Sequence, residues 1–338
     1  MRRLFGMLAI VGALCFGAAG QAREPIFDMH LHASAADEQG PSPLGICSPI
    51  DPKPDWDGRG SWGEAMVAFF KHPPCRHPIW SPMTDAQVQA RSLAAMRRLN
   101  VIGVVNDEPA CAEHWRAAAP DRLYVGYSPG DAELADPALL ERRLVALKAQ
   151  GRVTAIGEVG ARYRGIDPGD PRLDGLWTVA EKLDLPVSLH VGPGPPGTPY
   201  LGTGYRARLS GPLALEEVLV RHPRLRLNVM HAGYPMLDAT LPLFYAHPQV
   251  YVDVSVIDWT QPRAAFYRYL RALVEAGFGR RILFGSDQMI WPEAIERAVA
   301  TIRAAPFLTR AQQRDILYDN AARFLRLDAA TIARHHAM

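Results

Sequence analysis

Six residues that commonly bind metal ions stand at the ends of apolar runs in this sequence. His30 and His32 are two residues apart in the first run, so on a β-strand both side chains leave the same face and can reach one ion. Later runs end in polar residues of the same kind, namely Glu158, His190, His231 and Asp287. Burying imidazoles and carboxylates together costs several kcal/mol apiece unless they are paired or bound to metal. The set therefore predicts a metal centre.

The other histidines serve as an internal control. His222 and His247 each precede a proline and lead into a predicted strand, which places them on the rim opposite the metal centre. The remaining five lie in predicted loops or at the tail: His72, His77, His114, His335 and His336. We assign none of these seven residues to the metal.

The elements that must position the six residues alternate along the chain. Short apolar runs are separated by longer stretches with helical periodicity, a pattern typical of strand and helix units around a parallel sheet. Several runs are apolar on both faces, as buried parallel strands are. The eight predicted strands are Ile26 to His32, Val101 to Val105, Leu123 to Tyr127, Val153 to Val159, Val187 to Val191, Leu225 to His231, Val250 to Val254 and Ile282 to Asp287.

The predicted helices have recognisable ends. One has Asp136 as N-cap, Pro137 in its first turn and Gly151 after its end, and others begin at Thr84, after Ser210 and after Thr309. Such units, repeated along one chain, predict a single α/β domain over residues 23–338, a (β/α)8 TIM barrel. The alternative is an open doubly wound sheet. That fold normally has a glycine-rich turn after its first strand, which this chain lacks.

The order of the motifs resembles the amidohydrolase superfamily. The motifs are Asp28-x-His30-x-His32, Gly157-Glu158-Val159-Gly160, His190, His231-Ala232-Gly233 and Gly285-Ser286-Asp287. The tail from Asn320 to Leu325 is similar to the closing helix of the amidohydrolase-related branch, which includes aromatic-acid decarboxylases and lactone hydrolases. The likeness covers residues 25 to 327.

This resemblance implies a ligand set for two ions. His30, His32 and Asp287 would hold the first ion, His190 and His231 the second, and Glu158 would bridge them. Many two-metal relatives bridge with a modified lysine, whereas TatD-like deoxyribonucleases use a glutamate. If Glu158 does not bridge, one ion would use His30, His32, His190 and Asp287. The nitrogen and oxygen ligands accept Zn, Mn, Fe or Ni, and we expect Zn.

The expected chemistry is a hydrolysis. Asp287 would take a proton from the attacking water and give it to the leaving group of an amide, lactone or ester. Asp28 would lie behind the metal ligands and orient an imidazole or a strand end. With a single ion, His231 would become the acid, base or oxyanion residue, and nonoxidative decarboxylation of an aromatic or unsaturated acid is the alternative. A third hypothesis is an inactive ligand-binding barrel.

Segments near the strand ends are expected to bind a small substrate, which can be anionic. Residues 33–82 follow the first strand and are predicted to form a lid, with Trp56, Trp62 and Trp80 as aromatic walls and Phe69 and Phe70 in its own core. Arginines suit a substrate carboxylate or phosphate. The predicted substrate-binding residues are Arg162, Tyr163, Arg164, Tyr205, Arg206, Arg208 and Trp259, and weaker candidates for the site are Asp253 and Asp258.

The first 22 residues predict export. Arg2 and Arg3 precede an apolar run that ends in Gln21-Ala22, as in a secretory signal peptide at residues 1–22 that is removed and leaves no membrane span. We therefore expect a periplasmic or secreted protein. An oxidising compartment permits a disulfide, for which Cys47 and Cys75 are the predicted pair, with Cys111 free.

The charge balance argues against a nucleic-acid partner. The chain has 37 Lys and Arg residues against 35 Asp and Glu, and removal of residues 1–22 would take away Arg2 and Arg3 and make the counts equal. Nucleic-acid binding would require a basic surface. The sequence leaves the oligomeric state open, and a homo-oligomer is allowed.

Overall fold

Eight parallel strands form a nearly closed barrel. The computed structural model describes residues 23–338, so the predicted signal peptide lies outside the described residues. The strands are hydrogen-bonded in the order β1-β4-β5-β6-β7-β8-β9-β10. Beyond β10, the Met29 amide donates to the Phe284 carbonyl (2.9 Å) and the Asp287 amide donates to the His30 carbonyl (2.8 Å), which returns the last strand to the first. The predicted TIM barrel is confirmed.

Each barrel strand lies within or next to one predicted run. β8 and β10 end before His231 and Asp287, whose φ values of 56° and 48° are incompatible with a strand. The strand bounds are β1 (Ile26–His32), β4 (Val101–Asn106), β5 (Leu123–Tyr127), β6 (Ala155–Val159), β7 (Val187–Leu189), β8 (Leu227–Val229), β9 (Val250–Asp253) and β10 (Ile282–Leu283).

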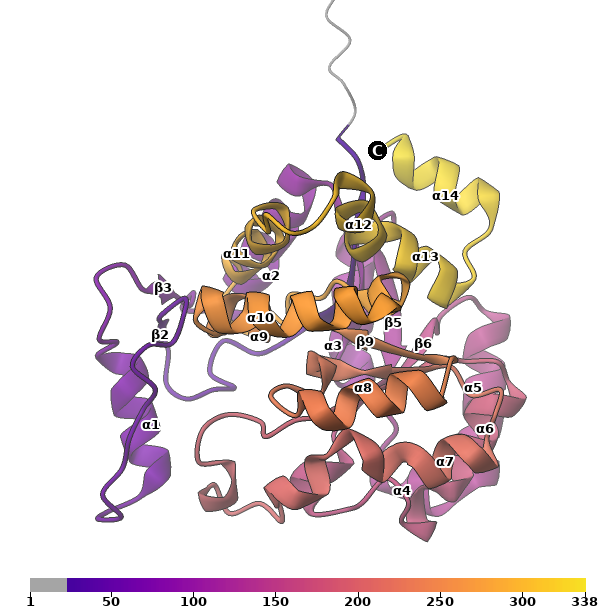
Figure 1. The fold of residues 1–338 in the computed structure, drawn as a ribbon, viewed down its shortest axis with the longest axis horizontal. Coiled ribbons are helices and arrows are strands. Elements are labelled where there is room, and N and C mark those ends of the chain that lie inside the picture. The colour runs from indigo at the N-terminus through magenta and orange to yellow at the C-terminus, as the bar shows by residue number, and fades with distance from the viewer. Residues whose placement is uncertain (1–22) are drawn as a thin grey trace, which may run out of the picture.

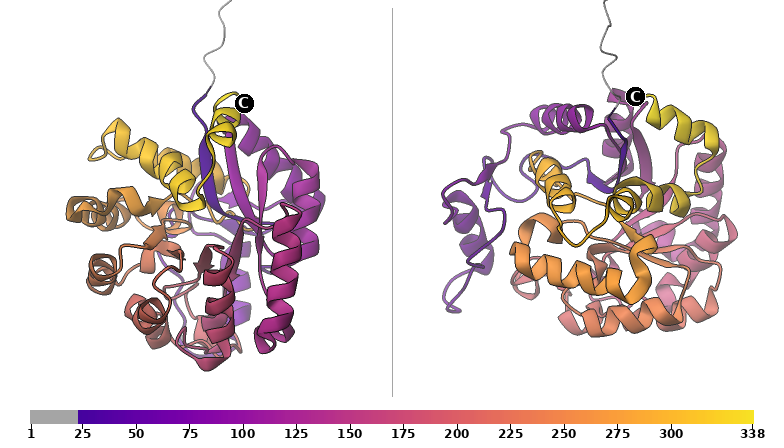
Figure 2. Two further views of the ribbon diagram at one scale, coloured as in Figure 1. Left: turned by 90° about the vertical axis from the view of Figure 1, so that its right-hand side faces the viewer. Right: turned by 45° about the horizontal axis from the view of Figure 1, so that its top comes forward.

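Helices surround the barrel (Figures 1 and 2). Three of them begin as predicted: the Asp136 side chain accepts hydrogen bonds from the amides of residues 138 and 139, the Thr84 hydroxyl accepts one from the Gln87 amide, and the Thr309 hydroxyl accepts one from the Gln312 amide. Across residues 23–338, no helix has both the length and the apolar character needed to cross a membrane. The bounds are α1 (Trp62–Lys71), α2 (Asp85–Leu99), α3 (Pro109–Ala118), α4 (Asp131–Ala135), α5 (Pro137–Ala149), α6 (Asp174–Lys182), α7 (Glu216–Arg221), α8 (Leu237–Ala246), α9 (Ile257–Thr260), α10 (Arg263–Leu273), α11 (Ala294–Arg303), α12 (Arg310–Arg314), α13 (Asn320–Leu325) and α14 (Ala329–His336).

Residues 33–82 form a substructure beside the barrel (Figures 1 and 2). It contains α1 and the antiparallel pair β2 (Gly45–Ile46) and β3 (Ile79–Trp80). Cys47 and Cys75 form a disulfide across it, with their Cα atoms 5.8 Å apart, and Cys111 is free and exposed. The disulfide joins the two ends of a segment that contains little regular structure besides α1.

Two tryptophans connect this substructure to the loop after β7. The Trp62 indole donates a hydrogen bond to the Pro196 carbonyl (3.0 Å), and the Trp56 ring lies 5.1 Å from the Tyr200 ring. At Gly197, a Cβ atom would come within 2.1 Å of the Trp62 ring, so the close approach requires glycine. The role of residues 33–82 as a lid stays a prediction.

The amino-terminal end of the barrel is closed by apolar side chains and by α14. Phe27 from β1 packs near Tyr124 and Tyr318. His335 of α14 is 1% exposed and its ring nitrogens contact the hydroxyls of Tyr124 (2.9 Å) and Tyr318 (2.8 Å). Burial and the charge of Arg334 lower the pKa of His335 to about 4.

We expect His335 to make folding stability depend on pH. Its pKa is about 4 in the folded protein against a usual value of 6.5. The unfolded chain therefore binds the extra proton first, and stability that is complete above pH 6.5 falls as the pH drops towards 4, by on the order of 3 kcal/mol. Urea unfolding between pH 7 and 4.5 should show a smaller loss in His335→Gln than in the wild type. His336→Gln, which changes the exposed neighbour, is the control, and equal slopes in all three proteins would contradict the expectation.

Candidate metal centre

The six predicted ligands meet at the carboxyl end of the barrel in two groups. In the first, His30 Nε2 lies 3.0 Å from His32 Nε2, and Asp287 Oδ1 lies 3.3 Å from His32 Nε2 and 3.8 Å from His30 Nε2. In the second, His190 Nδ1 lies 3.1 Å from His231 Nε2 and 2.7 Å from Glu158 Oε1. These groups match the two ligand triads that the resemblance implies.

Glu158 contacts both groups. Its Oε1 faces His190, while its Oε2 lies 3.3 Å from His30 Nε2 and 3.4 Å from His32 Nε2. The side chains of His32 and Glu158 are 16% and 17% exposed, whereas the His30 side chain is completely buried. Solvent therefore reaches the centre from the side of His32 and Glu158.

Buried carboxylates hold protons on the first pair of histidines. Burial by itself lowers the pKa of His30, but Asp287 and the neighbouring carboxylates outweigh it and raise this pKa to about 10. Burial likewise lowers the pKa of His32, and the neighbouring carboxylates of Asp107 and Asp287 raise it well above its usual range. Without a metal ion, the carboxylates therefore favour the protonated form of both rings.

The carboxylates of the centre are ionised. Burial acts to raise the pKa of Glu158, but hydrogen bonds with His190 and His30 hold it well below its usual range. Burial acts in the same way on Asp287, where the charge of His30 prevails and lowers the pKa. For His231, burial and the charge of His190 both lower the pKa. The centre thus combines ionised carboxylates with a neutral His231.

The donor set fits one or two divalent metal ions. Within each triad, the ligand atoms lie within 4.8 Å of one another. Atoms that share a tetrahedral ion at about 2.0 Å are roughly 3.3 Å apart, and the three contacts of the first group are 3.0, 3.3 and 3.8 Å. The Nε2 atoms of His30 and His32 repel each other at this distance whether they carry lone pairs or protons, and a shared cation would remove that repulsion. Within residues 23–338, His190 Nε2 is buried and has no hydrogen-bond partner.

Asp28 supports the backbone of the strands that carry the ligands. Its Oδ1 accepts hydrogen bonds from the amides of His30 and Ser286, both at 3.0 Å. It therefore holds strand ends together, one of the two roles expected for it. Burial raises the pKa of Asp28 to about 7.

Three polar residues support the histidines from behind, namely Asn228, Asp253 and Ser255. Only Asp253 was among the predicted candidates, as a weaker one. Asp253 Oδ1 accepts from the His231 amide (3.1 Å), and its Oδ2 accepts from the Asn228 side chain (2.8 Å). Ser255 Oγ lies 2.8 Å from His30 Nδ1 and 3.1 Å from His231 Nδ1. The alternation Asp253-x-Ser255 at the end of a predicted strand is the signal that could have identified Ser255.

Asp107 is a further residue beside the cluster that was not among the predicted site residues. It follows β4 directly, and its Oδ2 lies 3.8 Å from His32 Nδ1. A polar residue directly after a strand of a parallel barrel was the available signal. By contrast, Asp258 in α9 is buried, and neither of its carboxylate oxygens has a hydrogen-bond partner within the described residues.

The predicted substrate-binding residues occupy different positions. The Tyr163 ring packs on His190 with centroids 4.5 Å apart, and its hydroxyl is 3.4 Å from His190 Nδ1. Arg162, Tyr205 and Trp259 are buried, so substrate contact would require movement of the segments that cover them. The remaining predicted residues are exposed arginines, namely Arg164, Arg206 and Arg208. Arg164 forms an ion pair with Asp131.

The histidines excluded by the sequence lie outside the cluster. His222 is 3.4 Å from Glu181 and His247 is 3.7 Å from Glu216. His72, His77, His114 and His336 are exposed.

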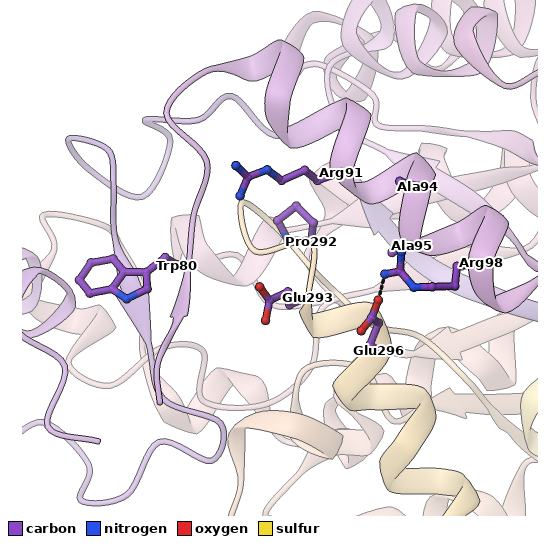
Figure 3. A pocket seen from close by; sticks show the side chains of 8 residues that line it. All are labelled: Trp80, Arg91, Ala94, Ala95, Arg98, Pro292, Glu293 and Glu296. Atoms are coloured by element: carbon purple, nitrogen blue, oxygen red, sulfur yellow. Dashed lines mark ion pairs between the residues drawn. The ribbon is translucent and has the colours of Figure 1, made fainter. Parts of the chain in front are cut away.

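Trp80 lines a cavity that does not include the six ligands. This surface cavity of about 190 Å³ lies between β3, α2 and the start of α11. Figure 3 shows Arg91 and Glu293 along its wall and the ion pair of Arg98 with Glu296 at its side. The expectation that Trp80 forms a wall of the substrate pocket is therefore not supported by its position.

Comparison with known proteins identifies the class. The model of the amidohydrolase family matches residues 27–327. Because this match covers most of the chain, the protein belongs to the amidohydrolase family, a family of metal-dependent enzymes, and the resemblance seen in the sequence is confirmed. Comparison with curated proteins gives no significant match.

Several solved structures share the fold. A probable 2-pyrone-4,6-dicarboxylic acid hydrolase from Acinetobacter baumannii with citric acid bound has a TM-score of 0.57 at 16% identity, over 89% of this chain and 99% of that chain. A 5-carboxyvanillate decarboxylase from Novosphingobium aromaticivorans, complexed with manganese and 4-hydroxy-3-methoxy-5-nitrobenzoic acid, has a TM-score of 0.59 at 12% identity, over 91% and 97%. A 2,6-dihydroxybenzoate decarboxylase from Rhizobium has a TM-score of 0.52 at 16% identity, over 90% and 100%. At these identities, the comparison shows the common fold alone.

We expect Asp253→Asn to destabilise the fold. Both carboxylate oxygens of Asp253 accept hydrogen bonds, so an amide NH2 in place of one oxygen would face another donor. An unsatisfied buried donor costs about 1–3 kcal/mol, measurable as a lower free energy of unfolding in urea. Asp55→Asn, at an exposed carboxylate, is the matched control. Equal stability of the Asp253 variant and the wild type would contradict the assigned hydrogen bonds.

Metal affinity should rise with pH. A metal ion must displace the protons of His30 and His32, and the pKa of His30 in the metal-free protein is about 10. Below that pKa, each displaced proton weakens binding about tenfold for every unit by which the pH falls. Competition with a chelator, corrected for the chelator's own protonation, should give an apparent Kd for Zn²⁺ at least about tenfold higher at pH 7 than at pH 8. A Kd independent of pH would show that the histidines are not protonated before binding.

Proposed function

We propose that this protein is a metal-dependent hydrolase that cleaves an amide, lactone or ester bond in a small substrate. The observation that carries the proposal is the position of Glu158, whose two oxygens contact His190 on one side and His30 and His32 on the other. A carboxylate in this position suits a bridge between two ions, the arrangement used to activate water for hydrolysis.

The residues divide into two ligand sets. His30, His32 and Asp287 would hold one divalent ion, and His190 and His231 would hold a second, with Glu158 shared. The chemistry that divalent ions supply in such centres is a lower pKa of water and a polarised carbonyl group. We propose Zn²⁺ as the ion, because nitrogen and oxygen donors suit it.

Two side chains are placed to handle protons. The pKa of Asp287 is lowered and its side chain is 10% exposed, so its carboxylate can accept a proton from an attacking water and return it to the leaving group. Burial and the charge of Glu158 raise the pKa of Tyr163 well above its usual range. The Tyr163 hydroxyl therefore keeps its proton at neutral pH and can donate a hydrogen bond to a substrate oxygen.

We further propose that the protein works outside the cytosol. The disulfide between Cys47 and Cys75 supports this location, because disulfides persist in oxidising compartments. The amino-terminal sequence, with two arginines before an apolar run, supports it independently.

A second candidate function is the nonoxidative decarboxylation of an aromatic or unsaturated acid. Its support is the similarity in fold to 5-carboxyvanillate and 2,6-dihydroxybenzoate decarboxylases. This chemistry would need a single ion on His30, His32, His190 and Asp287, with His231 free to act as an acid or base.

Metal content tests the proposed centre. The wild type, purified without chelator, should contain about two ions per chain by elemental mass spectrometry, and Glu158→Gln should contain one or none. Activity on a panel of lactones, esters and amides should produce a new carboxylate without release of carbon dioxide, and Glu158→Gln should lose at least about a hundredfold in kcat. Glu275→Gln, at an exposed site, is the control and should match the wild type.

Two outcomes of these experiments would contradict the proposed function. One ion per chain in the wild type, unchanged in Glu158→Gln, would contradict the bridging role of Glu158. Carbon dioxide release from an aromatic acid, without hydrolysis of any ester, lactone or amide, would favour the decarboxylase.

A further inference from the structure

Ser255 lies between one histidine of each triad. It follows β9 and is completely buried. Its hydroxyl oxygen is 2.8 Å from His30 Nδ1 and 3.1 Å from His231 Nδ1, and it also contacts Asp253 Oδ1. The backbone carbonyl of Ser255 lies 3.1 Å from the same His231 Nδ1. One residue thus touches the rear nitrogen of two proposed ligands that belong to different groups.

The hydrogens in this cluster can be assigned from donor and acceptor types alone. A carbonyl oxygen only accepts, so His231 Nδ1 must carry a hydrogen that points at the Ser255 carbonyl. A carboxylate oxygen also only accepts, so the single hydrogen of the Ser255 hydroxyl goes to Asp253 Oδ1. The Ser255 oxygen then presents lone pairs to His30, and His30 Nδ1 must be an N–H donor.

This assignment determines which nitrogen of each ring remains free for metal. With hydrogen on Nδ1, the ring of His231 has a lone pair on Nε2, and so does the ring of His30 once a metal ion has displaced its second proton. Those two Nε2 atoms are the ones that face the other ligands: His30 Nε2 lies near His32 and Glu158, and His231 Nε2 lies near His190. The rear hydrogen bonds therefore direct both lone pairs into the centre.

The surrounding chain holds Ser255 in place. The Ser255 amide donates to Asp253 Oδ1 (3.1 Å), and Asn228 holds the other oxygen of Asp253. At Gly285, a Cβ atom would come within 2.9 Å of the Cβ atoms of both Ser255 and His30. Glycine at that position lets the chain after β10 pack against both residues, so the 2.8 Å contact between Ser255 and His30 depends on Gly285.

We infer that Ser255 is a positioning residue that selects the Nδ1–H tautomer of His30 through its hydroxyl and that of His231 through its carbonyl. The inference deepens the proposed function and rests on it, because the rings that it orients are the proposed metal ligands. The side-chain hydroxyl and the backbone carbonyl of Ser255 lead to different expectations when the hydroxyl is removed by mutation. Loss of the hydroxyl removes the hydrogen-bond partner of His30, whereas His231 keeps the carbonyl.

Ser255→Ala tests this assignment with two readouts besides activity. The first is the Nδ1–H proton resonance of each histidine and its exchange with water, measured by NMR on histidine-labelled protein with and without Zn²⁺. The second is the affinity for Zn²⁺ by chelator competition. We expect the His30 Nδ1–H proton to exchange faster while that of His231 is retained, and one of the two ions to bind about 10–100-fold more weakly. Ser92→Ala, which removes another completely buried hydroxyl, is the control and should change neither readout.

Three results would overturn the inference. The first is an unchanged His30 proton together with unchanged Zn²⁺ affinity. The second is equal loss of both histidine protons, and the third is equal weakening of both ions, since either would indicate general disruption. Should Ser255→Ala not fold, Ser255→Cys, whose thiol is a weaker acceptor, must show the same changes to a smaller degree. A wild type that binds no Zn²⁺ would refute zinc as the proposed ion, while the proton spectra of the metal-free protein would still decide the role of Ser255.

Discussion

The structure depends on how negative charge is accommodated inside the carboxyl end of the barrel. Glu158, Asp253 and Asp287 are ionised there, in surroundings where an unpaired carboxylate would cost several kcal/mol. Imidazoles surround Glu158, and backbone amides together with an asparagine side chain surround Asp253. The protons held on His30 and His32 follow from the same excess of negative charge. A cation at this end of the barrel would satisfy a charge imbalance that the protein itself creates.

Two buried histidines respond to the two ends of the barrel in opposite ways. His30, among carboxylates, has its pKa raised to about 10, whereas His335, between two tyrosine hydroxyls at the apolar end, has its pKa lowered to about 4. Burial acts in the same direction on both rings. The difference comes from neighbouring charge. A histidine is thus surrounded by charged groups at the carboxyl end of the barrel and by aromatic packing at the amino-terminal end.

The groups behind the ligands come from several strands, so the centre depends on barrel closure. Asp28 bonds the amides of His30 and Ser286, which belong to the first strand and to the segment after the last. Ser255, after β9, contacts histidines that follow β8 and lie in β1. Backbone strain accompanies these positions, since His231, Val256 and Asp287 all have positive φ values. The fold must hold these conformations against their preference, which ties stability to the geometry of the site.

The sequence by itself determined the strand order, the barrel and the six residues that meet at its carboxyl end. It could do so because buried strands are apolar except where chemistry is needed, and because parallel strands in a barrel all end on the same rim. His30, Glu158 and Asp287 interrupt that pattern and are visible in one dimension. The disulfide pair was also foreseeable, since Cys47 and Cys75 are the two cysteines of a single segment with little periodicity.

Only the tertiary structure decided which groups hydrogen-bond to the six predicted ligands and which loops cover the rim of the barrel. Ser255 and Asn228 are small polar residues whose partners are up to 225 positions away, and nothing local distinguishes them from packed polar side chains. Arg162 and Trp259 follow strands as ligand-binding residues do, yet the chain covers them, because burial depends on how loops fold over the rim. Sequence periodicity reports which face of a strand a residue occupies. Distances across the barrel, and therefore hydrogen-bond partners and pKa shifts, arise only when the eight strands close.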